Sequence, residues 1–416
     1  MLDRRQAPQI HQISNVSLPE IESYPLSAGK RLYIHREKNT QAFKIEILCN
    51  AGNISATGAA QVQLGLKMLN EGTTNKSGHQ VSEHIDSLGS FLEITPGFDN
   101  SSISIYGLKK YFTENLRILS EILYKPSFNQ AAFDSLKTRE KNKLKMNLEK
   151  GSYLSSVNLR KALFGDHPYG FTQSIDQIDR LRIDEIVRFH QNIKSFDIYL
   201  AGDFPDHAVS LIRDLFAENL EAAEAQFDRT QPEAIDIEVR DSKYIQSSIK
   251  LGRRLFNRSH PDYFKFIVTN ELFGGFFGSR LMKNIREDKG YTYGIYSSLY
   301  PLKYGAYFLI STDVKGENEA DTLSEIKKEI ELLRTRPVSD NELEVVKNYM
   351  VGTFVNSFSS PFASITKFKT LNTQSIDFSF YSSYIENIRL ISVEDILNTS
   401  IQYLDFDDLT RSIVGS

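Results

Sequence analysis

The sequence contains little cysteine, no long apolar run and almost no excess of charge of either sign. Its single cysteine, Cys49, excludes an internal disulfide, and its place in the apolar segment 43–49 predicts a small, buried strand residue. No segment approaches the roughly 20 apolar residues that a membrane-spanning helix needs, so we expect no membrane partner. The net charge of −4 argues against a nucleic-acid surface.

The length of 416 residues exceeds what one hydrophobic core usually serves, so two domains of roughly 200 residues each are expected. The composition, 40% apolar and 25% charged, is typical of a soluble globular protein. The N-terminal residues are polar and are not followed by the apolar core of a signal peptide. We therefore expect a cytoplasmic protein, unless an export signal has been removed from the chain.

The two halves of the chain repeat one order of predicted elements. Each contains a helix, a glycine stop, two strands, an amphipathic helix, a proline that begins a further helix, and a closing helix and strand. The matching segments are 85–95 with 285–295, 101–107 with 305–312, 112–124 with 317–334, and 183–202 with 393–415. Each half is therefore predicted to be one α+β domain, with helices packed on one face of an antiparallel sheet.

The predicted domain boundaries follow from the composition between the repeats. Residues 1–217 form the first domain and 235–416 the second, and the polar segment 218–234, rich in alanine and glutamate, is the predicted linker. Two duplicated domains on a solvated connector favour halves that face one another across a binding cleft. A duplication without a cleft is the alternative.

The most informative segment is 274–297, which is predicted to form a glycine turn, a short helix, a stop at Gly290 and a strand. This order brings Arg286, at the helix end, close to Tyr293 on the strand. Both side chains donate hydrogen bonds, and the guanidinium keeps its charge at any working pH, so the pair can hold peptide carbonyls or a developing oxyanion. In the alternative interpretation, Arg286 pairs with a surface carboxylate and Tyr293 packs in a sheet.

Five short motifs occur in an order that resembles the M16 peptidase family, which contains pitrilysin-like proteases and the mitochondrial processing peptidase. They are Ala-Gly-Asn-Ile at 51–54, Leu-Asn-Glu-Gly-Thr at 69–73, Ile-Asp-Ser-Leu-Gly at 85–89, Phe-Gly-Asp-His-Pro-Tyr-Gly at 164–170 and Tyr-Leu-Ala-Gly-Asp at 199–203. The resemblance covers nearly the whole chain. It also implies that Arg286 and Tyr293 contact substrate, because the block 274–297 is similar to the family's substrate-contacting segment.

The same resemblance shows where this chain departs from active members. Those carry His-x-x-Glu-His on a first-domain helix, where two imidazoles hold Zn²⁺ and the glutamate activates water. The matching positions, in the segment 60–72, are Gln63, Leu66 and Lys67. Glutamine is a poor neutral ligand, leucine takes no proton, and an ammonium repels a dication. Glu140 is the nearest candidate for the third family ligand, but its basic surroundings favour helix-surface ion pairs.

A second segment, from His79 to His84, resembles the zinc motif only superficially. Its histidines are five residues apart, which places the two rings about 140° apart around a helix, so they do not share one ion. We expect an ordinary helix there. No metal or other cofactor is therefore predicted for this chain.

Taken together, the resemblance implies a zinc-free, non-catalytic subunit of a heterodimeric peptidase. In that hypothesis the chain binds extended peptide and supplies Arg286 and Tyr293 to a partner, an M16 paralogue that carries His-x-x-Glu-His and the zinc. A second hypothesis is a peptide-binding or scaffolding pseudo-peptidase without a role in catalysis, and a homodimer is possible. A self-sufficient zinc peptidase has no ligand set in this sequence.

Overall fold

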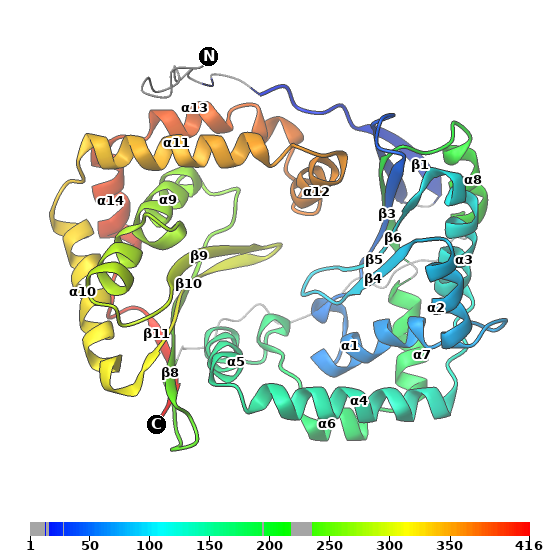
Figure 1. Cartoon of the computed structure of the whole chain (residues 1–416), viewed down its shortest axis with the longest axis horizontal. Helices are drawn as coiled ribbons and strands as arrows, with labels where there is room; N and C mark the ends of the chain where they lie inside the picture. The colour runs from blue at the N-terminus through cyan, green and yellow to red at the C-terminus, as the bar shows by residue number, and fades with distance from the viewer. Residues whose placement is uncertain (1–12, 14–15, 28, 194, 218–234) are drawn as a thin grey trace, which may run out of the picture.

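The computed structural model describes residues 13, 16–27, 29–193, 195–217 and 235–416, so the predicted linker 218–234 lies outside the described residues. Two sheets lie on opposite sides of the molecule, one from each half (Figure 1). The first-half strands are β1 (Glu22–Ser27), β2 (Lys30–Arg36), β3 (Ala42–Cys49), β4 (Phe91–Thr95), β5 (Ser101–Leu108) and β6 (Phe196–Gly202). The second-half strands are β7 (Ile237–Arg240), β8 (Gln246–Leu255), β9 (Ile295–Leu302), β10 (Gly305–Lys315) and β11 (Thr410–Gly415).

The two sheets share one topology, which confirms the predicted α+β class and its duplication. The order is β1-β2-β6-β3-β5-β4 in one and β7-β11-β8-β10-β9 in the other, so β1 is the only strand without a counterpart among the described residues. Each sheet contains one parallel pair, β2 with β6 or β7 with β11, where only antiparallel pairs were expected. The closing strand causes this, because it inserts between two strands of opposite direction and must run parallel to one of them.

The helices repeat in the same way. The first half contains α1 (Ala59–Lys67), α2 (Gly78–Ser87), α3 (Phe112–Tyr124), α4 (Gln130–Leu148), α5 (Gly151–Phe164), α6 (Ile175–Arg180), α7 (Ile183–Ile193) and α8 (Ala208–Phe216). The second contains α9 (Tyr263–Asn270), α10 (Glu319–Thr335), α11 (Asp340–Asn356), α12 (Pro361–Asn372), α13 (Tyr384–Leu390) and α14 (Val393–Tyr403). The predicted helix 112–124 coincides with α3. No helix among the described residues is long and apolar enough to cross a membrane.

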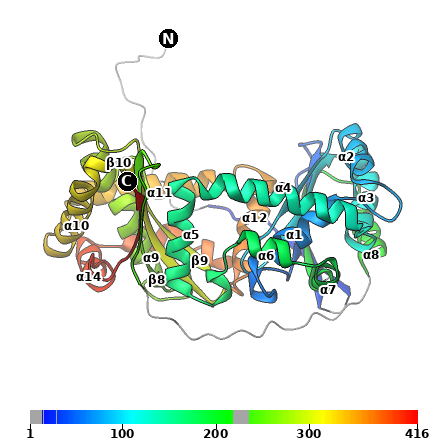
Figure 2. The same cartoon turned by 90° about the horizontal axis from the view of Figure 1, so that it is seen from below.

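The halves exchange one helix each, which the sequence did not predict. Helix α5 continues from α4 toward the second half and packs on β8 and β11 (Figures 1 and 2). Helix α12 of the second half packs on β2 and β6, where Ile365 joins Tyr33 and Tyr199 in one buried cluster. Burying a side chain of this size contributes about 1.5–3 kcal/mol. Each sheet thus also contacts a helix of the other half, and the two cores interlock.

Candidate functional site

The degenerate zinc positions lie on α1, and each side chain has a different environment. Leu66 is fully buried in the first-half core, while Gln63 lines a cavity of about 300 Å³. The Lys67 ammonium contacts Glu140, with 2.7 Å between Nζ and Oε2. Glu140 is only 9% exposed, so the expectation of helix-surface ion pairs is wrong. Lys67, at the position predicted to match the second histidine, instead neutralises Glu140, the candidate for the third ligand position.

The burial of Glu140 follows from its place on α4. The buried residues of that helix recur at helical spacing and form one stripe: Phe133, Leu136, Glu140 and Leu144. A carboxylate on an inward stripe needs a cation or hydrogen-bond donors, because an unpaired buried charge is costly. This stripe was the available signal in the sequence, and the basic residues around it obscured it.

The cavity beside Gln63 is lined mostly by neutral side chains, and among its charged residues the cations outnumber the carboxylates. Lys143 and Arg160 line it, and Glu140 is the only carboxylate among its described lining residues. The Arg160 guanidinium lies 5.1 Å from the centre of the Phe98 ring, and burial lowers the pKa of Arg160. Within the described ranges, no group of three or more histidine, cysteine, aspartate or glutamate side chains could hold a metal ion. This donor set does not fit Zn²⁺, since its cations would repel the ion.

The segment from His79 to His84 forms α2, the ordinary helix that was expected. A capping box of Ser77 and Gln80 begins it. His79 pairs with Glu83 at 3.2 Å between Nδ1 and Oε2, and both side chains are well exposed. The two histidines do not belong to a common ligand group.

The block that contains Arg286 and Tyr293 has an unusual backbone. Two π-helical segments, Glu271–Gly275 and Met282–Asp288, precede Gly290, which has the left-handed φ of +68° expected of a helix stop. Segments of this kind are rare in proteins and are frequent at functional sites.

Tyr293 lies two residues before β9, so the prediction that it belongs to the strand is wrong. Pairing with β10 begins at Ile295, opposite Thr312. The hydroxyl of Thr292 lies within hydrogen-bonding distance of the carbonyl oxygens of Gly294 and of a β10 residue, at 3.0 and 2.8 Å, which fixes the backbone before the ladder starts. Tyr293 is 93% exposed as a result, which also excludes the alternative that it packs in the sheet.

Arg286 stacks on an aromatic ring instead of pairing with a carboxylate. Its guanidinium carbon lies 4.4 Å from the centre of the Phe277 ring. Among the described residues, no ion pair or side-chain hydrogen bond engages Arg286 or Tyr293, and none joins the two. The donors of both side chains thus remain available for a ligand. Phe277, at 56% exposure, adds an apolar surface beside them.

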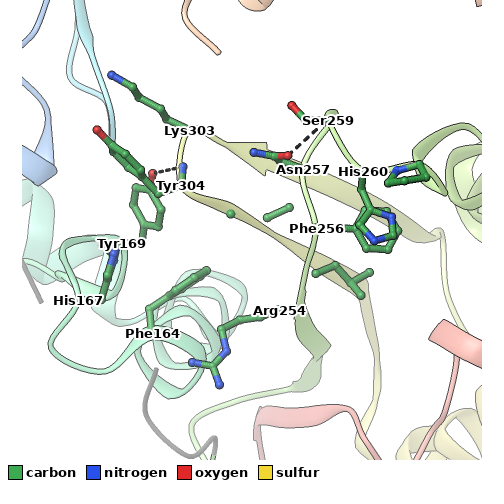
Figure 3. Close-up of a pocket in the computed structure, with 14 residues that line it drawn as sticks. Phe164, His167, Tyr169, Arg254, Phe256, Asn257, Ser259, His260, Lys303 and Tyr304 are labelled. Atoms are coloured by element: carbon green, nitrogen blue, oxygen red, sulfur yellow. Dashed lines mark hydrogen bonds between the residues drawn. The ribbon is translucent and has the colours of Figure 1, made fainter. Parts of the chain in front are cut away.

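A larger cavity, of about 630 Å³, lies where the two halves meet (Figure 3). It is bordered by the segment 164–169 of the first half, the segment 254–261 that includes the end of β8, and the β9–β10 turn. Aromatic and basic side chains line it, and no carboxylate belongs to its described lining. Such a surface suits an anionic group with apolar parts.

The β9–β10 turn is held by first-half residues at the edge of this cavity. The Tyr304 backbone N–H donates to the Tyr169 hydroxyl at 3.2 Å, as Figure 3 shows. The Asp99 carboxylate accepts a hydrogen bond from the Tyr169 hydroxyl and another from the Lys303 backbone N–H, the latter at 2.9 Å. Burial raises the pKa of Asp99. His167 accepts the Tyr169 N–H at Nδ1, which holds this turn together.

The sequence of this chain is similar to those of several known proteins. The family model described as Peptidase M16 inactive domain matches residues 181–350. The Helicobacter pylori "Non-peptidase homolog YmxG" is 23% identical in an alignment of 379 residues that covers 85% of each chain. The Bacillus subtilis "Uncharacterized zinc protease YmxG" is 23% identical over 350 residues, covering 82% of this chain and 85% of that protein.

Solved structures show the same fold. The crystal structure of a peptidase M16 inactive domain from Pseudomonas fluorescens is 21% identical with a TM-score of 0.86, over 95% of this chain and 98% of that one. A protease from Helicobacter pylori is 16% identical with a TM-score of 0.88, over 96% and 100%. Motif order, duplicated topology and these matches agree: the chain is similar over most of its length to proteins of the M16 peptidase family, and its segment 181–350 matches the family model of the inactive domain.

Proposed function

We propose that this chain is the zinc-free, non-catalytic subunit of a heterodimeric M16-type peptidase. In this role it binds extended peptide and supplies Arg286 and Tyr293 to the active site of a partner. The partner is an M16 paralogue that carries His-x-x-Glu-His and holds the zinc. A cytoplasmic location belongs to the same proposal.

One contrast carries this proposal. At the predicted zinc position Glu140 is the only carboxylate among the described residues that line the cavity, and Lys67 neutralises it. In the second half, Arg286 and Tyr293 keep their hydrogen-bond donors, and Tyr293 is 93% exposed. Side chains that the chain itself does not use, on an unusual π-helical backbone, are suited to act on something outside it.

The chemistry of the two side chains fits a supporting role in peptide hydrolysis. The partner's zinc would supply the activated water. Tyr293 would donate its hydroxyl hydrogen to the oxyanion that develops on the attacked carbonyl. Arg286, which Phe277 holds in place, would bind a neighbouring carbonyl of the substrate and fix its register.

The open sheet edges favour a substrate in extended form. Among the described strands, β9 pairs only with β10 and β4 only with β5. The outer edge of β4 therefore offers backbone donors and acceptors to which an extended peptide can add as a further strand. On β9 this holds only beyond Ser297, because the Ile295 N–H and the Ser297 carbonyl are already engaged by Met282 and Asn270. On β9, Tyr296 and Tyr300 are 47% and 43% exposed and provide rings beside that edge.

Reconstitution tests the proposal. The purified chain is expected to show no hydrolysis of a peptide library alone, and hydrolysis is expected on mixing with a zinc-bearing M16 paralogue. A paralogue that is equally active without this chain, or a mixture that stays inactive although a complex forms, would contradict the proposal. Zinc analysis of the separated subunits is expected to place the metal in the paralogue.

A second candidate function is a peptide-binding or scaffolding pseudo-peptidase without a part in catalysis. The cavity of about 630 Å³ favours it, because neither Arg286 nor Tyr293 lines that cavity. The name "Probable inactive metalloprotease" of the Bacillus subtilis relative YmfF, 22% identical over 267 residues, is in accord with it. Peptide binding to the chain alone, unchanged in an Arg286→Ala, Tyr293→Phe variant, would favour this function over the first.

A further inference from the structure

A separate cavity of about 360 Å³ in the second half carries charges of both signs. It lies among the π-helical segment 271–275, α11, α12 and the start of α13. Glu271 supplies a carboxylate, and Arg258 and Lys367 supply two cations. Aromatic side chains form most of the remaining lining: Tyr263, Tyr349, Phe354, Phe380, Tyr381 and Tyr384. Neither Arg286 nor Tyr293 belongs to it, so a ligand of this cavity would bind independently of the proposed function.

The carboxylate of Glu271 has no protein partner within the described ranges. It takes part in no hydrogen bond or ion pair there, and burial alone raises the pKa of Glu271 to about 7. The backbone makes room for it, because a Cβ at position 275 would lie 2.5 Å from Glu271 Oε2. Only Gly275 leaves that space. A carboxylate so placed is stabilised in its charged form by a cation that enters the cavity.

The two cations likewise have no carboxylate partner among the described residues. Arg258 donates from Nη1 to the neutral amide oxygen of Gln374 at 2.9 Å. The Lys367 ammonium lies 5.7 Å from the centre of the Tyr381 ring, and burial, together with the charge of Arg258, lowers the pKa of Lys367. Two neighbouring cations in a cavity are stabilised by an anion that contacts both.

Aromatic side chains connect the two kinds of charge. Tyr384 stacks on Phe354 with 4.1 Å between ring centres. Burial raises the pKa of Tyr384. The Glu271 carboxylate raises this pKa further, and the charge of Arg258 lowers it. Tyr384 is therefore within electrostatic reach of both Glu271 and Arg258, and all three line the same cavity.

We propose that this cavity binds a small zwitterion, an amino acid or dipeptide with an apolar side chain. Its ammonium group contacts Glu271, its carboxylate contacts Arg258 and Lys367, and its side chain lies on the rings of Tyr384 and Phe354. A volume of about 360 Å³ is at the lower end for ligand sites and excludes a long peptide.

Calorimetry on the full-length chain tests this proposal, with L-phenylalanine and glycyl-L-phenylalanine as probes. We expect at least one to bind, and we expect its N-acetyl and its amide derivatives, which lack one charge each, to bind about tenfold or more weakly. The Glu271→Gln variant should lose the contact to the ammonium group. Its affinity for the intact probe is therefore expected to equal the weak affinity of the native chain for the N-acetyl derivative. Likewise, the affinity of the Arg258→Gln variant for the intact probe is expected to equal that of the native chain for the amide derivative.

Two exposed residues outside the cavity provide matched controls, Glu287→Gln for the carboxylate and Lys283→Gln for the cation. Both variants are expected to bind the intact probe as the native chain does. The proposal is overturned if neither probe binds at about 10 mM, or if an N-acetyl or amide derivative binds the native chain as tightly as its parent. These derivative comparisons use only native protein, so they decide the question even if Arg258→Gln does not fold.

Discussion

The predicted zinc position on α1 and the segment around Arg286 lie in different halves of one duplicated topology. They differ in whether their polar and charged side chains are paired within the chain. On α1 and α4, Lys67 and Glu140 neutralise one another in a partly buried contact of 2.7 Å. In the second half, the donors of Arg286 and Tyr293 have no side-chain partner among the described residues, and Tyr293 is 93% exposed. The charges of the first region are satisfied within the chain, whereas the donors of the second have no side-chain partner among the described residues.

The largest stability effect is expected from the Lys67–Glu140 pair. Lys67→Met leaves the Glu140 carboxylate buried without its cation, which should lower the free energy of unfolding by about 2–4 kcal/mol. Urea denaturation measures it. The matched control is Lys141→Met, next to Glu140 on α4, which breaks the more exposed pair of Lys141 with Asp179 of α6 and should cost under about 1 kcal/mol. Equal losses in the two variants would show that Glu140 does not depend on Lys67.

Histidines introduced at the predicted zinc positions on α1 test whether this region can still bind a metal. Gln63→His with Lys67→His removes the competing cation and gives two imidazoles one turn apart, close to Glu140. We expect this variant to bind zinc at least about tenfold more tightly than the native chain, as measured by calorimetry. Adding Glu140→Gln to this variant should abolish the increase in zinc affinity. Zinc binding that is indifferent to Glu140 would mean that this residue is not the remnant of the third ligand.

The buried Glu271 of the second half predicts an effect of pH on stability. The folded-state pKa of Glu271, about 7, lies above that of the unfolded chain, so the stability of the native protein should fall as the pH rises from about 4.5 to 7. Glu271→Gln lacks this loss. It should therefore be more stable than the native chain by on the order of 2 kcal/mol at pH 8, and equal to it near pH 4.5. Denaturation curves at both pH values check this.

Glu287→Gln, an exposed change in the neighbouring π-helical segment, serves as the control and should alter stability equally little at both pH values. A difference between Glu271→Gln and the native chain that is the same at pH 4.5 and pH 8 would contradict the raised pKa.

The smallest expected effect concerns the ring beneath Arg286. Phe277→Ala removes the stacking surface of the guanidinium, at a cost of about 0.5–1 kcal/mol because the site is exposed. Activity in the reconstituted mixture should fall about threefold, since the guanidinium is then less well oriented. Phe91→Ala, which truncates an exposed ring on β4, should leave stability nearly unchanged. Identical results for both variants would show that Phe277 does not position Arg286.

Much of the fold could be predicted because its signals are local. The apolar spacing of 112–124 was sufficient to define α3, and the ordinary helix expected at His79 and His84 is α2. Helix exchange was not predictable in this way. The residues that α5 and α12 bury look alike whether the covered sheet belongs to their own half or to the other, and nothing in the periodicity distinguishes the two.

The candidate site was predictable in its residue types but not in its contacts. Lys67 and Glu140 are 73 positions apart, so only the fold brings them together. The position of Tyr293 before β9 depends on the hydrogen bonds of Thr292, which a pattern of strand residues does not contain. Glu271 gave no signal in the sequence, because its burial results from the π-helical segment and from the aromatic side chains that close over it.

The turnover number of the reconstituted heterodimer tests the central claim most directly. It should be measured with the native chain, with Arg286→Ala, Tyr293→Phe, and with the control Lys283→Ala, which alters an exposed cation one turn before Arg286. We predict that the double variant lowers kcat by about 100-fold or more while the complex still forms, and that the control keeps the native rate. A double variant that assembles and turns over at full speed would contradict the claim.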